Sequence, residues 1–153
     1  MYSQSMQRQK FAISTLFVVV QFACLGLIAL TGPLFPFYPA LLVVELLGIG
    51  LGIWAIFAMR PGNFNITPDP LDHSELVTSG PYRLIRHPMY LALLLTTLPL
   101  IIYEFDIMRL TIWMVLLLNL ILKLNYEENL LTGTLAGYDL YVKRSYRLIP
   151  RVY

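Results

Sequence analysis

The sequence has little charge and almost no cysteine. Of its 153 residues only 13% are charged and a single one, Cys24, is a cysteine, whereas 58% are hydrophobic. Soluble domains carry about 25% charged and about 45–50% apolar residues. One cysteine excludes an intrachain disulfide framework, and so few charges argue against disorder and against a nucleic-acid partner. The composition therefore indicates one integral membrane domain, residues 1–153.

The apolar residues form four blocks, which predict four transmembrane helices at about residues 11–31, 40–59, 88–103 and 107–124. The first two have the ~20 residues that cross a bilayer, and the shorter last two predict a helical hairpin around residues 104–106. A signal peptide is the alternative for the first block, but no small-residue cleavage site follows it. We therefore expect an all-α integral membrane fold with a loop at residues 60–87 and a helical C-terminal segment at residues 125–153.

The basic residues are concentrated on one side of these predicted spans. Arg109 alone lies on the opposite side from the other ten, which are Arg8, Lys10, Arg60, Arg83, Arg86, Lys123, Lys143, Arg144, Arg147 and Arg151. The positive-inside rule assigns the basic side to the cytoplasm. We therefore predict that both termini, the loop and the C-terminal segment are cytoplasmic.

Two charged motifs are predicted to meet on that side. Residues 80–90, GPYRLIRHPMY, begin the third span, and residues 123–128, KLNYEE, end the fourth. A hairpin that turns at residues 105–106 brings His87 opposite Leu124. A helix N-terminus with nearby arginines favours an anion, whereas carboxylates favour an ammonium or sulfonium, so the pair suits a zwitterionic ligand. The alternative is that the arginines anchor the membrane surface and the glutamates form a solvated face.

The motif LVTSGPY at residues 76–82, with RHPMY at 86–90 and the later Glu127-Glu128 pair, resembles the signature of the isoprenylcysteine carboxyl methyltransferase and phospholipid methyltransferase superfamily. The resemblance covers roughly residues 68–150. It implies an integral membrane enzyme that binds S-adenosylmethionine in a cytosol-facing pocket roofed by the C-terminal segment. A lipophilic acceptor, such as a prenylcysteine-like carboxylate or a lipid amine, would enter from the bilayer.

The resemblance also implies roles for individual residues. Glu127 would hold the amino group of the cofactor. The expected cofactor pocket comprises Glu75, Leu76, Val77, Tyr82, Arg86, His87, Tyr90 and Glu127. Lys123 stands where the carboxyl methyltransferases have an arginine that helps to orient the substrate carboxylate, so we predict that it contacts the acceptor. The candidate catalytic residues are Glu128, Lys123 and Arg86, with Glu128 or His87 as the base for an amine or hydroxyl acceptor.

Further polar residues lie inside the predicted spans. Glu45 is a candidate for the acceptor tunnel or a satisfied interface glutamate. Gly48 and Gly52 predict close helix packing, and Asn119 predicts an interhelical hydrogen bond. No spacing of histidine, cysteine and carboxylates predicts a metal site.

The chain has fewer predicted spans than the eukaryotic carboxyl methyltransferases that it resembles, which suggests a minimal prokaryotic form, in the inner membrane, with another acceptor. The sequence leaves the oligomeric state open. A membrane reductase of the sterol-reductase type that uses NADPH is an alternative function. A non-catalytic membrane or lipid-binding subunit is another.

Overall fold

The computed structural model describes residues 2–59, 76–135 and 137–152. Its elements are α1 (Tyr2–Leu30), α2 (Pro39–Ala58), the short 3₁₀ helix η1 (Gly80–Arg83), α3 (Pro88–Tyr103), α4 (Ile107–Thr134) and α5 (Tyr138–Val142). Within the described residues, one isolated bridge is the only non-helical regular pairing. The all-α prediction is confirmed, whereas Glu75 and most of the predicted loop lie outside the described residues.

Three of these helices are long and apolar enough to cross a membrane, through residues 8–30 of α1, all of α2, and residues 107–132 of α4. The fourth apolar helix, α3, is shorter, at 16 residues. Large apolar side chains face outward from the bundle, among them Leu47, Trp54 and Phe57 of α2. Because soluble proteins rarely expose such continuous apolar surface, this burial pattern is that of an integral membrane protein.

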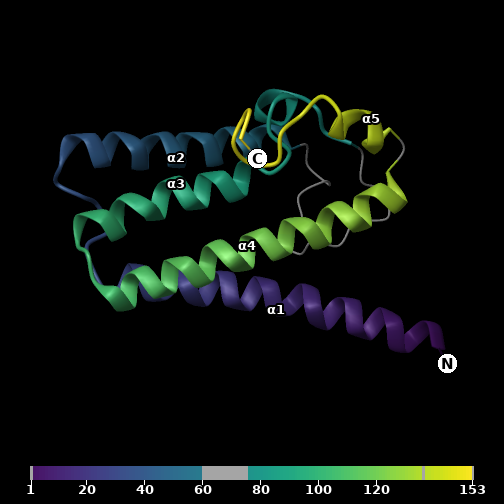
Figure 1. Cartoon of the computed structure of the whole chain (residues 1–153), viewed down its shortest axis with the longest axis horizontal. Helices are drawn as coiled ribbons and strands as arrows, with labels where there is room; N and C mark the ends of the chain where they lie inside the picture. Colours follow the sequence, from purple (N-terminus) through teal and green to yellow (C-terminus); the bar gives the residue numbers. More distant parts are fainter. Residues whose placement is uncertain (1, 60–75, 136, 153) are drawn as a thin grey trace.

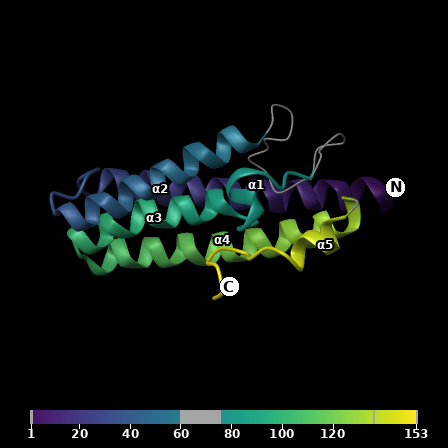
Figure 2. The same cartoon turned by 90° about the horizontal axis from the view of Figure 1, so that it is seen from above.

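The helices pack as two pairs, α2 along α3 and α1 along α4 (Figure 1). Contacts between α3 and α4 join the pairs, as the predicted hairpin requires. The central apolar cluster is drawn from α1, α3 and α4 and contains Cys24, Ile28, Leu100, Ile101, Leu116 and Leu120. Figure 2 shows the same bundle from above, with α5 and the C-terminal segment beside α4.

Side chains satisfy both helix ends at the tip of the hairpin. The carboxylate of Asp106 accepts hydrogen bonds from the backbone amides of Met108 (2.8 Å) and Arg109 (3.3 Å), which caps α4. The buried guanidinium of Arg109 donates to the Leu100 carbonyl near the end of α3 (3.1 Å). The positive charge there also favours the negative end of the α3 dipole, so the tip fixes the relative position of the two helices.

The predicted close packing and the predicted interhelical hydrogen bond are both confirmed. A Cβ atom added to Gly48 would lie 2.7 Å from the backbone nitrogen of Thr96, so α2 and α3 approach closely there. The Asn119 amide donates to the Phe17 carbonyl on α1 (3.1 Å).

The helical conformation expected for residues 125–153 does not extend to Tyr146. Helix α5 ends at Val142, and Tyr146 lies in extended chain that forms a parallel bridge with Ile85. The Tyr146 amide donates to the Leu84 carbonyl (2.9 Å) and its carbonyl accepts from the Arg86 amide (2.7 Å). Because these backbone groups pair with a distant segment, they are not available for hydrogen bonds within a helix.

Candidate functional site

The segment before α3 is fixed to the C-terminal segment by backbone hydrogen bonds. Besides the two bonds at Tyr146, the His87 amide donates to the Arg147 carbonyl (3.1 Å). His87 is then the residue that precedes α3, and Pro88 occupies the first helical turn, where its missing N–H is not required. This pairing brings the Arg-His-Pro motif and the C-terminal segment together at one end of the bundle.

Glu128 lies at the centre of a charged network that includes Arg86, His87 and Arg147. Its Oε1 accepts from Arg86 Nε (2.7 Å) and lies 3.3 Å from His87 Nε2, while its Oε2 lies 3.0 Å from Arg147 Nη2. Only 10% of the Glu128 side chain is exposed. A buried carboxylate is tolerated when it is paired and hydrogen-bonded, and here both of its oxygens are engaged.

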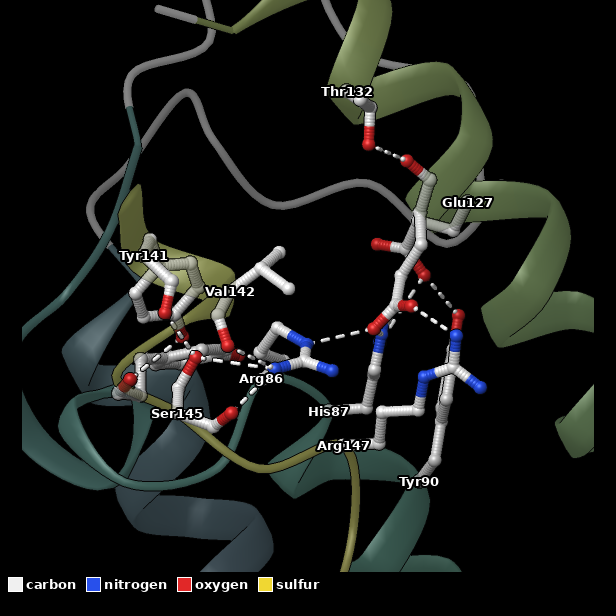
Figure 3. Close-up of polar contacts among 11 residues, drawn as sticks. Arg86, His87, Tyr90, Glu127, Thr132, Tyr141, Val142, Ser145 and Arg147 are labelled. Carbon is white, nitrogen blue, oxygen red and sulfur yellow. Dashed lines mark hydrogen bonds and ion pairs between the residues drawn. The ribbon is translucent and has the colours of Figure 1, made fainter. Parts of the chain in front are cut away.

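Arg86 extends this network from α4 to the C-terminal segment. Its Nη1 donates to the carbonyls of Val142 (3.2 Å) and Ser145, two residues that lie beside its guanidinium in Figure 3. The Tyr141 hydroxyl adds a second link by donating to the Tyr82 carbonyl (2.6 Å). The chain that follows α4 is thus held against the start of α3 by side-chain as well as backbone bonds.

Glu127 is held by a different set of partners. The Tyr90 hydroxyl donates to Glu127 Oε2 (2.7 Å), and His87 Nδ1 lies 3.6 Å from the same oxygen. The rings of His87 and Tyr90 stack, with centroids 5.3 Å apart. Lys123, one turn closer to the bundle centre, donates to Gln21 Oε1 (2.9 Å) and lies 5.3 Å from the centroid of the Tyr90 ring.

These groups form one end of a cavity of about 460 Å³. Its polar lining at that end comprises Tyr82, Arg86, His87, Tyr90, Lys123 and Glu127. The rest is mostly apolar and is contributed by α1, α2 and α3, including Phe22, Leu25, Ile49, Ile53 and Leu93. A cavity of this size and composition suits a ligand with one charged part and one apolar part.

Two tyrosines outside the spanning helices are neutral over a wide pH range. Burial raises the pKa of Tyr82, and the nearby Glu127 carboxylate raises it further. Tyr82 lines the cavity, and its buried hydroxyl has no hydrogen-bond partner among the described residues. Burial also raises the pKa of Tyr141, to about 12, although the Arg86 charge opposes this shift.

The structure brings most of the predicted site residues together. His87 was expected opposite Leu124, but its ring contacts Glu127 and Glu128, about one turn further along α4. The two glutamate side chains reach back to His87 because side chains lean toward the N-terminus of their helix. Leu76 and Val77 precede η1 and do not line the cavity. Glu45 is buried in α2, with 2% of its surface exposed, and does not line the cavity either.

Gln21 is a polar cavity residue that the sequence-based prediction of the site does not include. It reaches Lys123 from α1, more than a hundred residues earlier in the chain. An amide inside an apolar span is a signal for a polar contact within the bundle, so Gln21 was detectable as a candidate. The sequence does not say which residue it meets, because that depends on the pairing of α1 with α4.

The fold and the site define a class, an integral membrane protein whose helical bundle holds a charged site at one end of an apolar cavity. The chain belongs to the phospholipid methyltransferase family, whose sequence profile matches residues 39–136. This match confirms the resemblance to the wider isoprenylcysteine and phospholipid methyltransferase superfamily and implies a membrane methyltransferase. It covers α2, α3 and the site residues on α4 but ends before α5. No curated protein and no solved structure matches the chain.

Proposed function

We propose that this protein transfers a methyl group from S-adenosylmethionine to a lipophilic acceptor that reaches the cavity from the bilayer. The observation that carries the proposal is the Glu127 carboxylate, which lines an otherwise largely apolar cavity and is oriented by Tyr90 and His87. Membership of a methyltransferase family supports the same reaction class.

The residues at the polar end fit this cofactor. Glu127 would accept the ammonium group, and the faces of Tyr82 and Tyr90 suit a sulfonium, which aromatic rings attract. The Tyr82 hydroxyl is a buried donor without a partner in the described chain, as expected of a group that contacts a ligand. The prediction that Glu75, Leu76 and Val77 contact the cofactor stays part of the proposal, with Leu76 and Val77 acting from the segment just before η1 and not from the cavity lining.

When bound, S-adenosylmethionine supplies a methyl group that its sulfonium already activates. The tasks of the protein are therefore orientation and exclusion of water. Tyr90 and His87 hold the Glu127 carboxylate in one position, and Arg86, which lines the cavity, binds carbonyls of the C-terminal segment. We infer that Arg86 and Glu128 act as positioning residues, because their polar atoms bond to each other and to the C-terminal segment.

The apolar lining supports an acceptor with a hydrocarbon chain, and Lys123 supports one with an anionic group near the reacting atom. Lys123 lines the cavity between the Glu127 end and the apolar walls of α1 and α2. A carboxylate acceptor requires no general base, whereas an amine must lose a proton before or during transfer. Both acceptor classes remain within the proposal, and they give chemically different products.

Methyl-labelled S-adenosylmethionine and bacterial lipid extracts, added to the purified protein in nanodiscs, test the proposal. We expect label in the lipid fraction, and release of that label as methanol by mild alkali if the product is a methyl ester. A methylated amine would keep its label under alkali. Glu127→Gln should reduce the labelling at least tenfold.

Glu104→Gln is the matched control, since Glu104 is an exposed residue at the far end of α3. This variant should label lipid as the unmodified protein does. The proposal would be overturned by the absence of labelled lipid with every extract, or by equal labelling in the Glu127→Gln protein.

A further inference from the structure

The C-terminal segment, residues 143–152, has an exposed face in addition to the face that contacts Arg86 and Glu128. Residues 143–152 contain four basic residues, of which Arg147 faces inward and contacts Glu128. Lys143, Arg144 and Arg151 are exposed. Within the part of the chain that the structure describes, these three side chains form no ion pair. The surface therefore carries three positive charges without a neutralising carboxylate among those residues.

Apolar side chains lie among these basic residues in the sequence of the segment. Leu148 is buried, whereas Ile149 and Val152 are exposed, Val152 by 76%. Exposed aliphatic groups between basic residues are unfavourable in water. The same pattern is typical of segments that lie in the membrane interface, with apolar groups inserted and basic groups near lipid phosphates.

The segment also lies at the right level along the bundle. Residues 146 and 147 pair with residues 84–87, immediately before α3 begins, and the chain continues from there. Figures 1 and 2 both show the end of the chain at the level of the start of α3 along the long axis, outside the helical bundle. Because α3 is an apolar helix that begins at this level, its first turn lies close to one end of the apolar part of the bundle.

We propose that residues 143–152 form a docking surface for anionic lipid headgroups at this boundary. Lys143, Arg144 and Arg151 bind the phosphates, and Ile149 and Val152 insert among the upper acyl carbons. Charge complementarity and the continuity of this surface with the apolar helices identify the occupant as the lipid surface. Each basic residue close to an anionic leaflet contributes on the order of 1 kcal/mol to such docking.

Docking also affects the site, in a step that rests on the proposed function. The same segment supplies the Ser145 carbonyl to Arg86 and Arg147 to Glu128. A segment held on the membrane keeps these contacts with Arg86, which lines the cavity, and with Glu128 beside it. Anionic lipid should therefore slow the release of bound cofactor.

The test attaches a polarity-sensitive fluorophore to Val152→Cys in a Cys24→Ala background, which removes the natural cysteine. The full-length protein is placed in nanodiscs of neutral lipid, or of neutral and anionic lipid, with a quencher on a fraction of the lipids. We expect stronger quenching with anionic lipid and loss of that increase at high salt, where headgroup charges are screened.

Arg144→Gln combined with Arg151→Gln should lower the docked-to-undocked ratio about thirtyfold in anionic nanodiscs. Arg8→Gln combined with Lys10→Gln is the matched control, because both residues are exposed on α1 at the same end and carry the same total charge. This control should quench as the unmodified protein does.

The proposal would be overturned by equal quenching in neutral and anionic nanodiscs. It would also be overturned if the double variant Arg144→Gln, Arg151→Gln were quenched as strongly as the unmodified protein. A blue-shifted probe that lipid-borne quenchers do not reach would indicate a protein partner or a second copy of the chain, and would overturn it too. None of these readouts requires methyl transfer. Failure of docking is therefore distinguishable from failure of the proposed function, which the labelling assay measures.

Discussion

Glu127 and Glu128 are neighbours in the sequence but occupy different surroundings. Successive residues of an α-helix point about 100° apart, so the two carboxylates face different parts of the site. Glu127 lines the cavity with 27% of its side chain exposed, whereas Glu128 is nearly enclosed by Arg86, His87 and Arg147. At the scale of single residues, the cavity-lining carboxylate that we propose binds the ligand is thus separate from the carboxylate that holds the C-terminal segment.

Glu128→Gln should destabilise the protein much more than Glu127→Gln does. It removes the charge that neutralises the buried Arg86, and an unpaired buried charge costs about 3–5 kcal/mol. We expect the free energy of unfolding in detergent to fall by about 3 kcal/mol, with faster proteolysis after residue 137. Equal destabilisation by both substitutions would contradict this division of roles.

The raised pKa of Tyr141 predicts how the stability of the fold changes at high pH. Its pKa in the folded protein is raised to about 12 from an ordinary value near 10, so folding favours the protonated phenol. The stabilisation is fully present below about pH 10 and is lost as the pH rises toward 12. Phenolate absorbance at 295 nm, compared between the unmodified protein and Tyr141→Phe, should show this one hydroxyl titrating late. A difference curve centred near pH 10 would contradict the prediction.

At the scale of helices, close approach of α2 to α3 sets the wall of the cavity. Gly48 and Gly52 line the cavity on α2, and Ala92 and Thr96 line it on α3. The added Cβ of Gly48 would meet the backbone of α3, which cannot move aside as a flexible side chain does. The spacing of this pair of helices therefore depends on the absence of a side chain at Gly48.

Gly48→Ala should lower the free energy of unfolding by about 1–3 kcal/mol, the typical effect of overpacking. Gly50→Ala is the control, since no atom lies within 4 Å of a Cβ added at Gly50 on the same helix. It should leave stability unchanged or slightly increased, because alanine favours helix. Thermal unfolding of both variants in detergent measures the difference, and similar losses in both would contradict the packing account.

The helices, the hairpin and the meeting of the two charged motifs were predictable from sequence, because the lengths of apolar runs and a tight turn determine them. The sequence placed Asp106 in the polar tip of the hairpin, but only the structure shows the hydrogen bonds by which it caps α4. The bridge between Ile85 and Tyr146 was not predictable, since it uses backbone groups that every residue has. The carbonyl partners of Arg86 are hidden from sequence for the same reason.

At the scale of the whole molecule, the cavity results from how the two helix pairs are arranged. α1 and α2 belong to different pairs, yet both contribute apolar walls, while α4 and the residues just before α3 supply the charged end. An apolar cavity that ends at a fixed carboxylate fits the proposed transfer of a methyl group to a lipophilic acceptor.

Binding of the cofactor at Glu127 is the central claim, and titration calorimetry of the detergent-purified protein tests it most directly. We predict one site for S-adenosylhomocysteine and S-adenosylmethionine at submillimolar concentrations, and no comparable binding of NADPH. Glu127→Gln should weaken both adenosyl ligands more than tenfold, as loss of a charged hydrogen bond of about 1.5–3 kcal/mol implies, while Glu104→Gln should not. Absence of heat with both adenosyl ligands, or unchanged affinity in Glu127→Gln, would contradict the account.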